Sequence, residues 1–155
     1  MNNWTKLTIE EKLTILSNVA ESKGIVDNAV EKDYWVSMVL RAIFTLPYAT
    51  AFVFKGGTSL SKGWSLIERF SEDIDLSMNR KPTQTERKAS KEHIVEIAKS
   101  LGMELTNPDQ IKSRHDYNMY VFSYDSLFAS KPMEIIVETS YYQTVYPVEK
   151  HGAEK

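Results

Sequence analysis

A glycine pair, followed sixteen residues later by two aspartates, is the sequence feature that most constrains the fold of this chain. Before the pair, residues 51–54 form a short apolar run that predicts a buried strand. Gly56 and Gly57 predict a turn, because glycine adopts positive φ without steric cost. Residues 58–68 then predict a helix, and residues 74–78 predict a second strand. The N-terminus of a helix beside a strand end suits a phosphate, since its unpaired N–H groups and partial positive charge attract anions.

The two aspartates stand at the start of the second predicted strand. Side chains alternate along a strand, so Asp73 and Asp75 share one face while the apolar residues between and after them face the core. Two carboxylates at this spacing repel each other unless a cation lies between them. Mg²⁺ takes such oxygen ligands and keeps positions for substrate phosphates. The pair therefore indicates a divalent metal site; the alternative is that both aspartates are solvated residues of a turn.

A pair of metal ions of the kind used in phosphoryl transfer needs a further carboxylate. Residues 133–139 predict a strand of nearly continuous isoleucine and valine, interrupted by Glu134 and Glu138. Both glutamates lie on one face of that strand. On these grounds either of them can supply the third acid.

The glycine turn is the phosphate-binding half of the expected site. Gly56 and Gly57 let the backbone approach a ligand closely, and Thr58 and Ser59 add hydroxyl donors. Lys62, in the helix that follows, can neutralise triphosphate charge. The turn is neither a P-loop nor a dinucleotide-binding fingerprint, because the sequence contains neither pattern.

Further cations lie near these elements in the sequence, namely Lys55, Arg69 and Arg80. Each of them can neutralise phosphate charge. For these cations, and for Lys62 as well, the alternative is an ordinary salt bridge. The candidate partners are acids such as Asp33, Glu31 or Glu72. The sequence leaves both interpretations open.

The other segments predict an α+β fold. Residues 8–19 predict a first helix, with Thr8 as its N-cap, Glu11 three residues on and Gly24 as the break after it. Residues 26–46 predict a second helix, which Pro47 ends, so that the two form an N-terminal helical pair. Residues 85–101 predict a further helix and residues 117–124 a further strand. With the elements above, this order favours a mixed β-sheet with flanking helices. We expect three parts: residues 1–48 as a helical segment packed on the core, residues 49–150 as the core, and residues 151–155 as a tail.

Composition excludes several classes of protein. The 155 residues include no cysteine, which rules out disulfides and thiolate metal sites. The net charge of −2 gives no overall attraction to nucleic acid, so an RNA partner needs a local basic patch. The first residues lack the pattern of a signal peptide, and no apolar stretch approaches the ~20 residues of a membrane span. We therefore expect a cytoplasmic location and no membrane partner.

The segments 54–62 (FKGGTSLSK) and 68–76 (ERFSEDIDL) resemble the AbiEii/AbiGii toxin-type nucleotidyltransferases, members of the DNA polymerase β-like nucleotidyltransferase superfamily. The segment 31–36 (EKDYWV) is similar to one that is common ahead of the glycine turn in that family. The similarity runs through most of the chain. It implies a nucleotidyltransferase core over residues 49–150, built as a mixed sheet with flanking helices.

The resemblance also implies an activity. Members of the family transfer a nucleotide from an NTP to an acceptor hydroxyl and depend on Mg²⁺ or Mn²⁺. The implied acceptor is an RNA such as tRNA, and the implied protein partner is a cognate antitoxin. The implied setting is a bacterial toxin–antitoxin or phage-defence system.

The family motif carries over to particular residues of this chain. By this resemblance, residues 57–59 (Gly57, Thr58 and Ser59) hold the triphosphate, while Asp73 and Asp75 hold the metal. The third acidic ligand falls on the later strand. Within the family pattern Glu138, followed by Thr-Ser, fits that ligand better than Glu134.

Members of the family usually continue into a helical half with further substrate-binding residues, whereas this sequence ends at Lys155. The leading hypothesis is a nucleotidyltransferase. The alternative is a truncated core that binds NTP or antitoxin without turnover.

Overall fold

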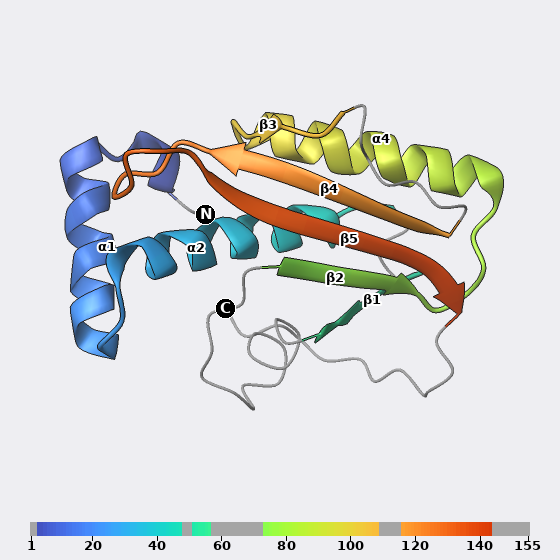
Figure 1. The fold of residues 1–155 in the computed structure, drawn as a ribbon, viewed down its shortest axis with the longest axis horizontal. Coiled ribbons are helices and arrows are strands. Elements are labelled where there is room, and N and C mark those ends of the chain that lie inside the picture. The colour runs from blue at the N-terminus through green and yellow to red at the C-terminus, as the bar shows by residue number, and fades with distance from the viewer. Residues whose placement is uncertain (1–2, 48–50, 57–72, 109–115, 144–155) are drawn as a thin grey trace.

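The computed structural model describes residues 3–47, 51–56, 73–108 and 116–143 (Figure 1). In chain order its elements are η1 (Asn3–Lys6), α1 (Ile9–Lys23), α2 (Asp27–Ile43), β1 (Phe52–Lys55), β2 (Asp73–Met78), α4 (Gln84–Ser100), β3 (Glu104–Leu105), β4 (Tyr117–Tyr124) and β5 (Met133–Gln143). The helix expected over residues 58–68 and the tail expected over 151–155 lie outside the described residues.

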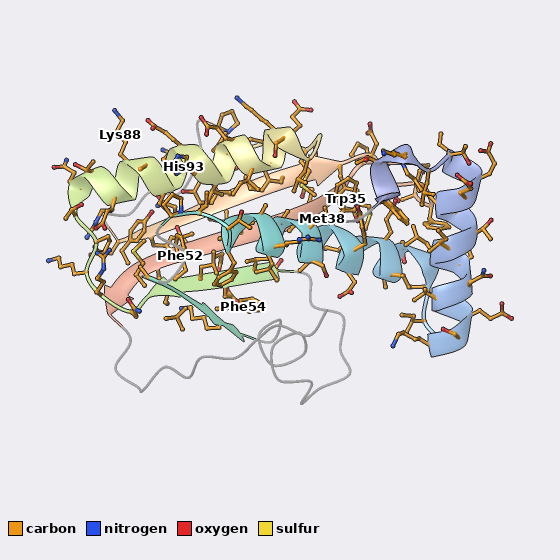
Figure 2. The ribbon with its side chains drawn as sticks, turned by 180° about the vertical axis from the view of Figure 1, so that it is seen from behind. Trp35, Met38, Phe52, Phe54, Lys88 and His93 are labelled. Carbon is orange, nitrogen blue, oxygen red and sulfur yellow. The ribbon has the colours of Figure 1, made fainter. Side chains whose placement is uncertain are left out.

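The strands form one mixed sheet in the order β1-β2-β5-β4-β3. β2 and β5 run parallel, whereas the other neighbouring pairs are antiparallel. α2 and α4 lie against the same face of this sheet, as the opposite views of Figure 1 and Figure 2 show. The α+β class and the mixed sheet with flanking helices are therefore confirmed. None of the described helices is long and apolar enough to cross a membrane.

Alternation along the strands builds the core beneath these helices. Ile74 and Leu76 of β2 have no exposed surface, and neither have Tyr120 and Phe122 of β4. From α2, the same core receives the apolar side chains Val36, Val39, Leu40 and Ile43. Fully burying such a side chain contributes about 1.5–3 kcal/mol. Burial therefore fixes which face of each strand meets the helices. The opposite face carries polar groups together with partly buried apolar residues such as Val121 and Ile136.

A second, smaller core joins the N-terminal helices to the connection between β4 and β5. Leu16, Ala20 and Val30 are buried there, and Leu127 and Phe128 from that connection pack against them. The helical pair that the sequence predicts thus contacts the sheet at two places, through α2 and through this connection.

The ends of the helices follow local signals, with two differences from the expected ranges. α1 continues to Lys23, beyond the expected end at residue 19. Thr8 and Glu11 form the expected capping box of α1, and Gly24 ends that helix with a φ of 65°. α2 ends at Ile43 rather than near Pro47. Residues 44–46 continue as tighter turns, in which the amides of Thr45 and Leu46 bond to carbonyls three residues back.

One buried carboxylate of α2 accepts hydrogen bonds from the connection between β4 and β5. Glu31 is 2% exposed; its Oε2 accepts from Ser126 Oγ at 2.5 Å and its Oε1 accepts from the Leu127 amide at 2.7 Å. Ser126 Oγ in turn accepts from the amides of Phe128 and Ala129. Hydrogen bonds to an ionised acceptor contribute about 1.5–3 kcal/mol each. Glu31 therefore holds residues 126–129 of the connection, directly or through Ser126.

We expect Glu31→Ala to lower the free energy of unfolding by about 2–4 kcal/mol, because the Leu127 amide and the Ser126 hydroxyl both lose their acceptor. Urea denaturation measures the change. The matched control is Glu21→Ala, an exposed glutamate of α1, for which a change within about 0.5 kcal/mol is expected. Equal stability of the two variants would show that the buried carboxylate contributes nothing.

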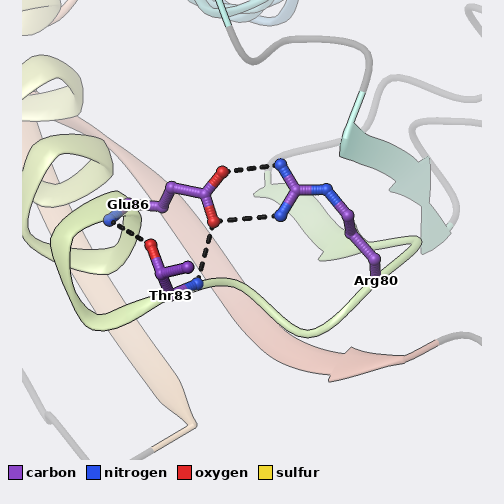
Figure 3. A network of polar contacts seen from close by, with 3 residues as sticks. All are labelled: Arg80, Thr83 and Glu86. Atoms are coloured by element: carbon purple, nitrogen blue, oxygen red, sulfur yellow. Dashed lines mark hydrogen bonds and ion pairs between the residues drawn. The ribbon is translucent and has the colours of Figure 1, made fainter.

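Three residues cap the start of α4 (Figure 3). Thr83 and Glu86 form a capping box, in which the Thr83 amide donates to Glu86 Oε2 at 2.8 Å and the Glu86 amide donates to Thr83 Oγ1 at 3.2 Å. Arg80 donates two further bonds to the same carboxylate, at 2.6 and 2.9 Å. The bonds from Arg80, and then the bond from Thr83, lower the pKa of Glu86 to about 2.

This lowered pKa makes the cap dependent on pH. A carboxylate with a depressed pKa stabilises the folded state above its ordinary value of 4.5, and this contribution is lost as the pH falls toward about 2. The difference in stability between the wild type and Glu86→Gln should therefore be largest near neutral pH and shrink below pH 4.5. Denaturation at a series of pH values measures it. A difference that stays constant with pH would exclude the charge of Glu86 as its cause.

Candidate active site

The register of β2 between β1 and β5 brings three charged side chains into one row. Asp75 is paired with Lys55 of β1 on one side and with Glu138 of β5 on the other. Residues paired across neighbouring strands direct their side chains to the same face, about 5 Å apart. Because Ile74 and Leu76 point to the helices, the row lies on the face of the sheet that α2 and α4 do not cover.

The two carboxylates of this row interact directly. Burial raises the pKa of Asp75 above its ordinary value, and a hydrogen bond with Glu138 and repulsion by its charge raise it further. The Lys55 ammonium lowers the pKa of Asp75, and Asp73 adds the smallest of the upward shifts. Two acids so close either share a proton or need a cation between them. Because carboxylate oxygens are the ligands of Mg²⁺ and Mn²⁺, the Asp75–Glu138 pair fits a divalent ion.

Gly56, the described residue of the glycine pair, lies against Asp75. Gly56 follows the last residue of β1 and has a φ of 75°, in the left-handed region. A Cβ at Gly56 would overlap Oδ2 of Asp75 and lie 3.1 Å from its Cγ. Glycine therefore allows both the backbone angle and the close approach of the turn to the carboxylate. The other residues expected to bind triphosphate lie outside the described residues: Gly57, Thr58, Ser59 and Lys62.

The other two predicted acids, Asp73 and Glu134, are not register partners of Asp75 or Glu138. Asp73 lies exposed at the start of β2, where its register partner is Ile136. Glu134 is exposed and lies four residues before Glu138 on β5, so Glu138 and not Glu134 pairs with Asp75. Among the residues that the structure describes, no group of three or more histidine, aspartate or glutamate side chains gathers as a metal site would. The metal-ligand roles of Asp73, Asp75 and Glu138 stay predictions.

Hydroxyl groups and a lysine flank the carboxylate pair. Tyr117 Oη donates to Glu138 Oε1 at 2.5 Å. Lys55 Nζ donates to Ser140 Oγ at 3.3 Å, and Ser140 Oγ lies 2.8 Å from Ser77 Oγ. Sequence reasoning assigned no role to these hydroxyls. Strand alternation alone places Ser77 and Ser140 on the acidic face, whereas placing Tyr117 requires the pairing of β4 with β5.

Arg80 does not take part in this site. It pairs with Glu86 at 2.6 Å, so the salt-bridge interpretation is confirmed for Arg80, with a partner other than the acids expected. Lys55 lies inside the row. Lys62 and Arg69 lie outside the described residues.

Two crystal structures from Helicobacter pylori share the fold. One protein, described as a candidate nucleotidyltransferase, is 22% identical with a TM-score of 0.55, and the match covers 76% of this chain and 47% of that protein. The other, JHP933, is 21% identical with a TM-score of 0.57, and the match covers 83% of this chain and 53% of JHP933. This chain therefore spans about half the length of these two structures. None of the curated proteins compared with the chain matches it significantly.

The family model described as "Nucleotidyl transferase AbiEii toxin, Type IV TA system" matches residues 39–154. This segment contains the glycine turn and the carboxylate pair of Asp75 and Glu138, and it makes up most of the chain. The family resemblance found in the sequence is thereby confirmed, and the mixed sheet is that of a nucleotidyltransferase core. This chain belongs to the AbiEii family of nucleotidyltransferase toxins.

Proposed function

We propose that this chain is the core of a metal-dependent nucleotidyltransferase that moves a nucleotide from an NTP to an acceptor hydroxyl on RNA, such as tRNA. The observation that carries the proposal is the meeting of Asp75 and Glu138 in register beside the turn at Gly56. Acids that repel each other next to a glycine turn favour binding of a cation together with a phosphate. Membership of a nucleotidyltransferase family supports transfer as the reaction.

In this proposal, different residues bind the metal ion and the triphosphate. Asp75 and Glu138, with Asp73 beside them, hold Mg²⁺ or Mn²⁺ through carboxylate oxygens. An ion held there would supply positive charge next to the phosphates and lower the barrier to attack by the acceptor oxygen. The turn over residues 56–59 holds the triphosphate through backbone N–H groups, and Lys62 adds positive charge.

The protein contributes mainly positioning. Asp75 and Glu138 stand on neighbouring strands inside the sheet, whose opposite face is fixed by the buried core. Groups held on such rigid elements align an acceptor hydroxyl with the α-phosphate of the NTP and stabilise the charge that develops during transfer. A low net charge of −2 means that the RNA would be held by a local patch rather than by the whole surface.

The biological setting belongs to the same proposal. The family description names a type IV toxin–antitoxin system. We place this chain accordingly as a toxin in the bacterial cytoplasm, acting with a cognate antitoxin protein in toxin–antitoxin or phage-defence biology.

One alternative function has specific support. The chain spans about half the length of the two matched structures, so the activity of a whole protein of that length does not follow for this chain alone. In this alternative the core binds NTP or the antitoxin without turnover. Calorimetry with each NTP, with and without Mg²⁺, distinguishes the two, since tight binding without product over hours supports the alternative.

We expect Asp75→Asn to reduce labelling of bulk tRNA from a radiolabelled NTP by on the order of 100-fold or more, because the charge that holds the ion is lost. Its unfolding temperature should not fall, since the repulsion between Asp75 and Glu138 is removed as well. The matched control is Asp125→Asn, an exposed aspartate beyond β4. Undiminished labelling by Asp75→Asn, or equal loss in the control, would reject the assigned site.

Two glycine variants separate backbone strain from damage to the site. Gly56 and Gly102 have similar positive φ values, 75° and 78°, but a Cβ at Gly102 meets nothing within 4 Å. Both Gly→Ala variants should lose about 1–2 kcal/mol of stability from strain. Only Gly56→Ala should also lose tRNA labelling, because its Cβ displaces the Asp75 carboxylate. Full labelling by Gly56→Ala would show that the close approach of the turn is not needed.

A further inference from the structure

Tyr117 lies in the site and has no role in the reaction described above. It is the first residue of β4, it is half-buried, and its hydroxyl donates a 2.5 Å hydrogen bond to Oε1 of Glu138 on β5. Tyr117 pairs with Ser140, whereas Glu138 pairs with Met119, so the contact runs diagonally across the two strands. An aromatic side chain is long enough to span such a diagonal.

Contacts from two other elements fix the start of β4. Asp116, directly before Tyr117, forms a 2.9 Å ion pair with Arg87 of α4, and its carbonyl accepts from the Tyr141 amide of β5 at 2.8 Å. The Arg87 guanidinium also lies 5.1 Å from the centre of the Tyr141 ring. The backbone at Tyr117 is therefore anchored to both the helix layer and the neighbouring strand, which keeps the start of its side chain at a fixed distance from Glu138.

Glu138 needs a restraint of this kind. It faces Asp75 across the strand pair. When both acids are ionised, as metal binding requires, their charges repel and the glutamate side chain can rotate away from its neighbour. Hydrogen bonds to the ligating side chains commonly orient them for a metal ion. A neutral hydroxyl is suited to this task, because it donates to the carboxylate without adding a positive charge that would compete with the ion.

We propose that Tyr117 is a positioning residue, which holds the Glu138 carboxylate beside Asp75 so that the two acids can bind a divalent cation together. The inference rests on the proposed function, since it takes the carboxylate pair as the metal site. Tyr117 acts through Glu138; one oxygen of that carboxylate receives the hydroxyl, and the other remains for the ion.

The test is binding of Mn²⁺ alone to the full chain, followed by electron paramagnetic resonance. Tyr117→Phe removes the hydroxyl and keeps the ring. It should weaken Mn²⁺ binding by about 10-fold, the lower end of the effect seen when a partner of a metal ligand is removed. Tyr124→Phe is the matched control on the same strand, because its buried hydroxyl has no hydrogen-bond partner among the described residues. Its Mn²⁺ affinity should equal that of the wild type.

A double variant separates positioning from general support of the fold. If Tyr117 acts through Glu138, Tyr117→Phe combined with Glu138→Gln should bind Mn²⁺ no more weakly than Glu138→Gln alone. A merely structural hydroxyl would change the unfolding temperature and leave the Mn²⁺ affinity of Tyr117→Phe unaltered. That result overturns the inference, while the proposed function stands if Asp75→Asn still abolishes binding. A wild type that binds no Mn²⁺ would reject the metal site itself, and the inference with it.

Discussion

The parallel pairing of β2 with β5 is the interaction on which the rest of the site depends. It places Asp75 opposite Glu138, and the antiparallel pairing with β1 adds Lys55 to the same row. A slip of one residue would turn the acids toward the helices and the apolar side chains toward solvent. Ile74 and Val137 are fully buried on the helix side, so such a slip would cost several kcal/mol, at about 1.5–3 kcal/mol for each side chain. The hydrophobic core thereby keeps the acids on the opposite face, and the pairing register decides which of them meet.

The pairing of Asp75 with Glu138 destabilises the ionised form of Asp75 in the folded protein. Asp75 is partly desolvated and faces Glu138, and both effects raise its pKa, whereas the Lys55 ammonium offsets only part of them. The neighbouring hydroxyls of Tyr117 and Ser140 give the carboxylate and the lysine neutral partners. Groups that destabilise a rigid sheet in this way are typical of sites arranged for a ligand, and a cation would relieve the repulsion.

The sequence predicts the parts of this structure that depend on local signals. The capping box at Thr8, the break at Gly24 and the alternation around Asp75 all follow from residues close together in the chain, and the structure contains each of them. Contacts between segments that lie far apart in the sequence are harder to predict. From the residues alone Glu134 and Glu138 are equivalent as partners of the aspartates, because the register between strands some sixty residues apart has no local signal. For the same reason the bond from Tyr117 to Glu138 has no local signal. The salt bridge of Arg80 with Glu86 joins residues only six apart, but Arg80 precedes α4, so the spacing of residues on a helix does not predict it.

The strand order has a consequence for the timing of synthesis. β5 is the last described strand in the chain, yet it lies in the middle of the sheet, between β2 and β4. A nascent polypeptide emerging from the ribosome exposes Asp75 long before Glu138 exists, and until then β2 lacks the neighbour that completes its pairing. Premature termination before Glu138 would therefore leave Asp75 and Gly56 in the chain but remove the second acid of the pair.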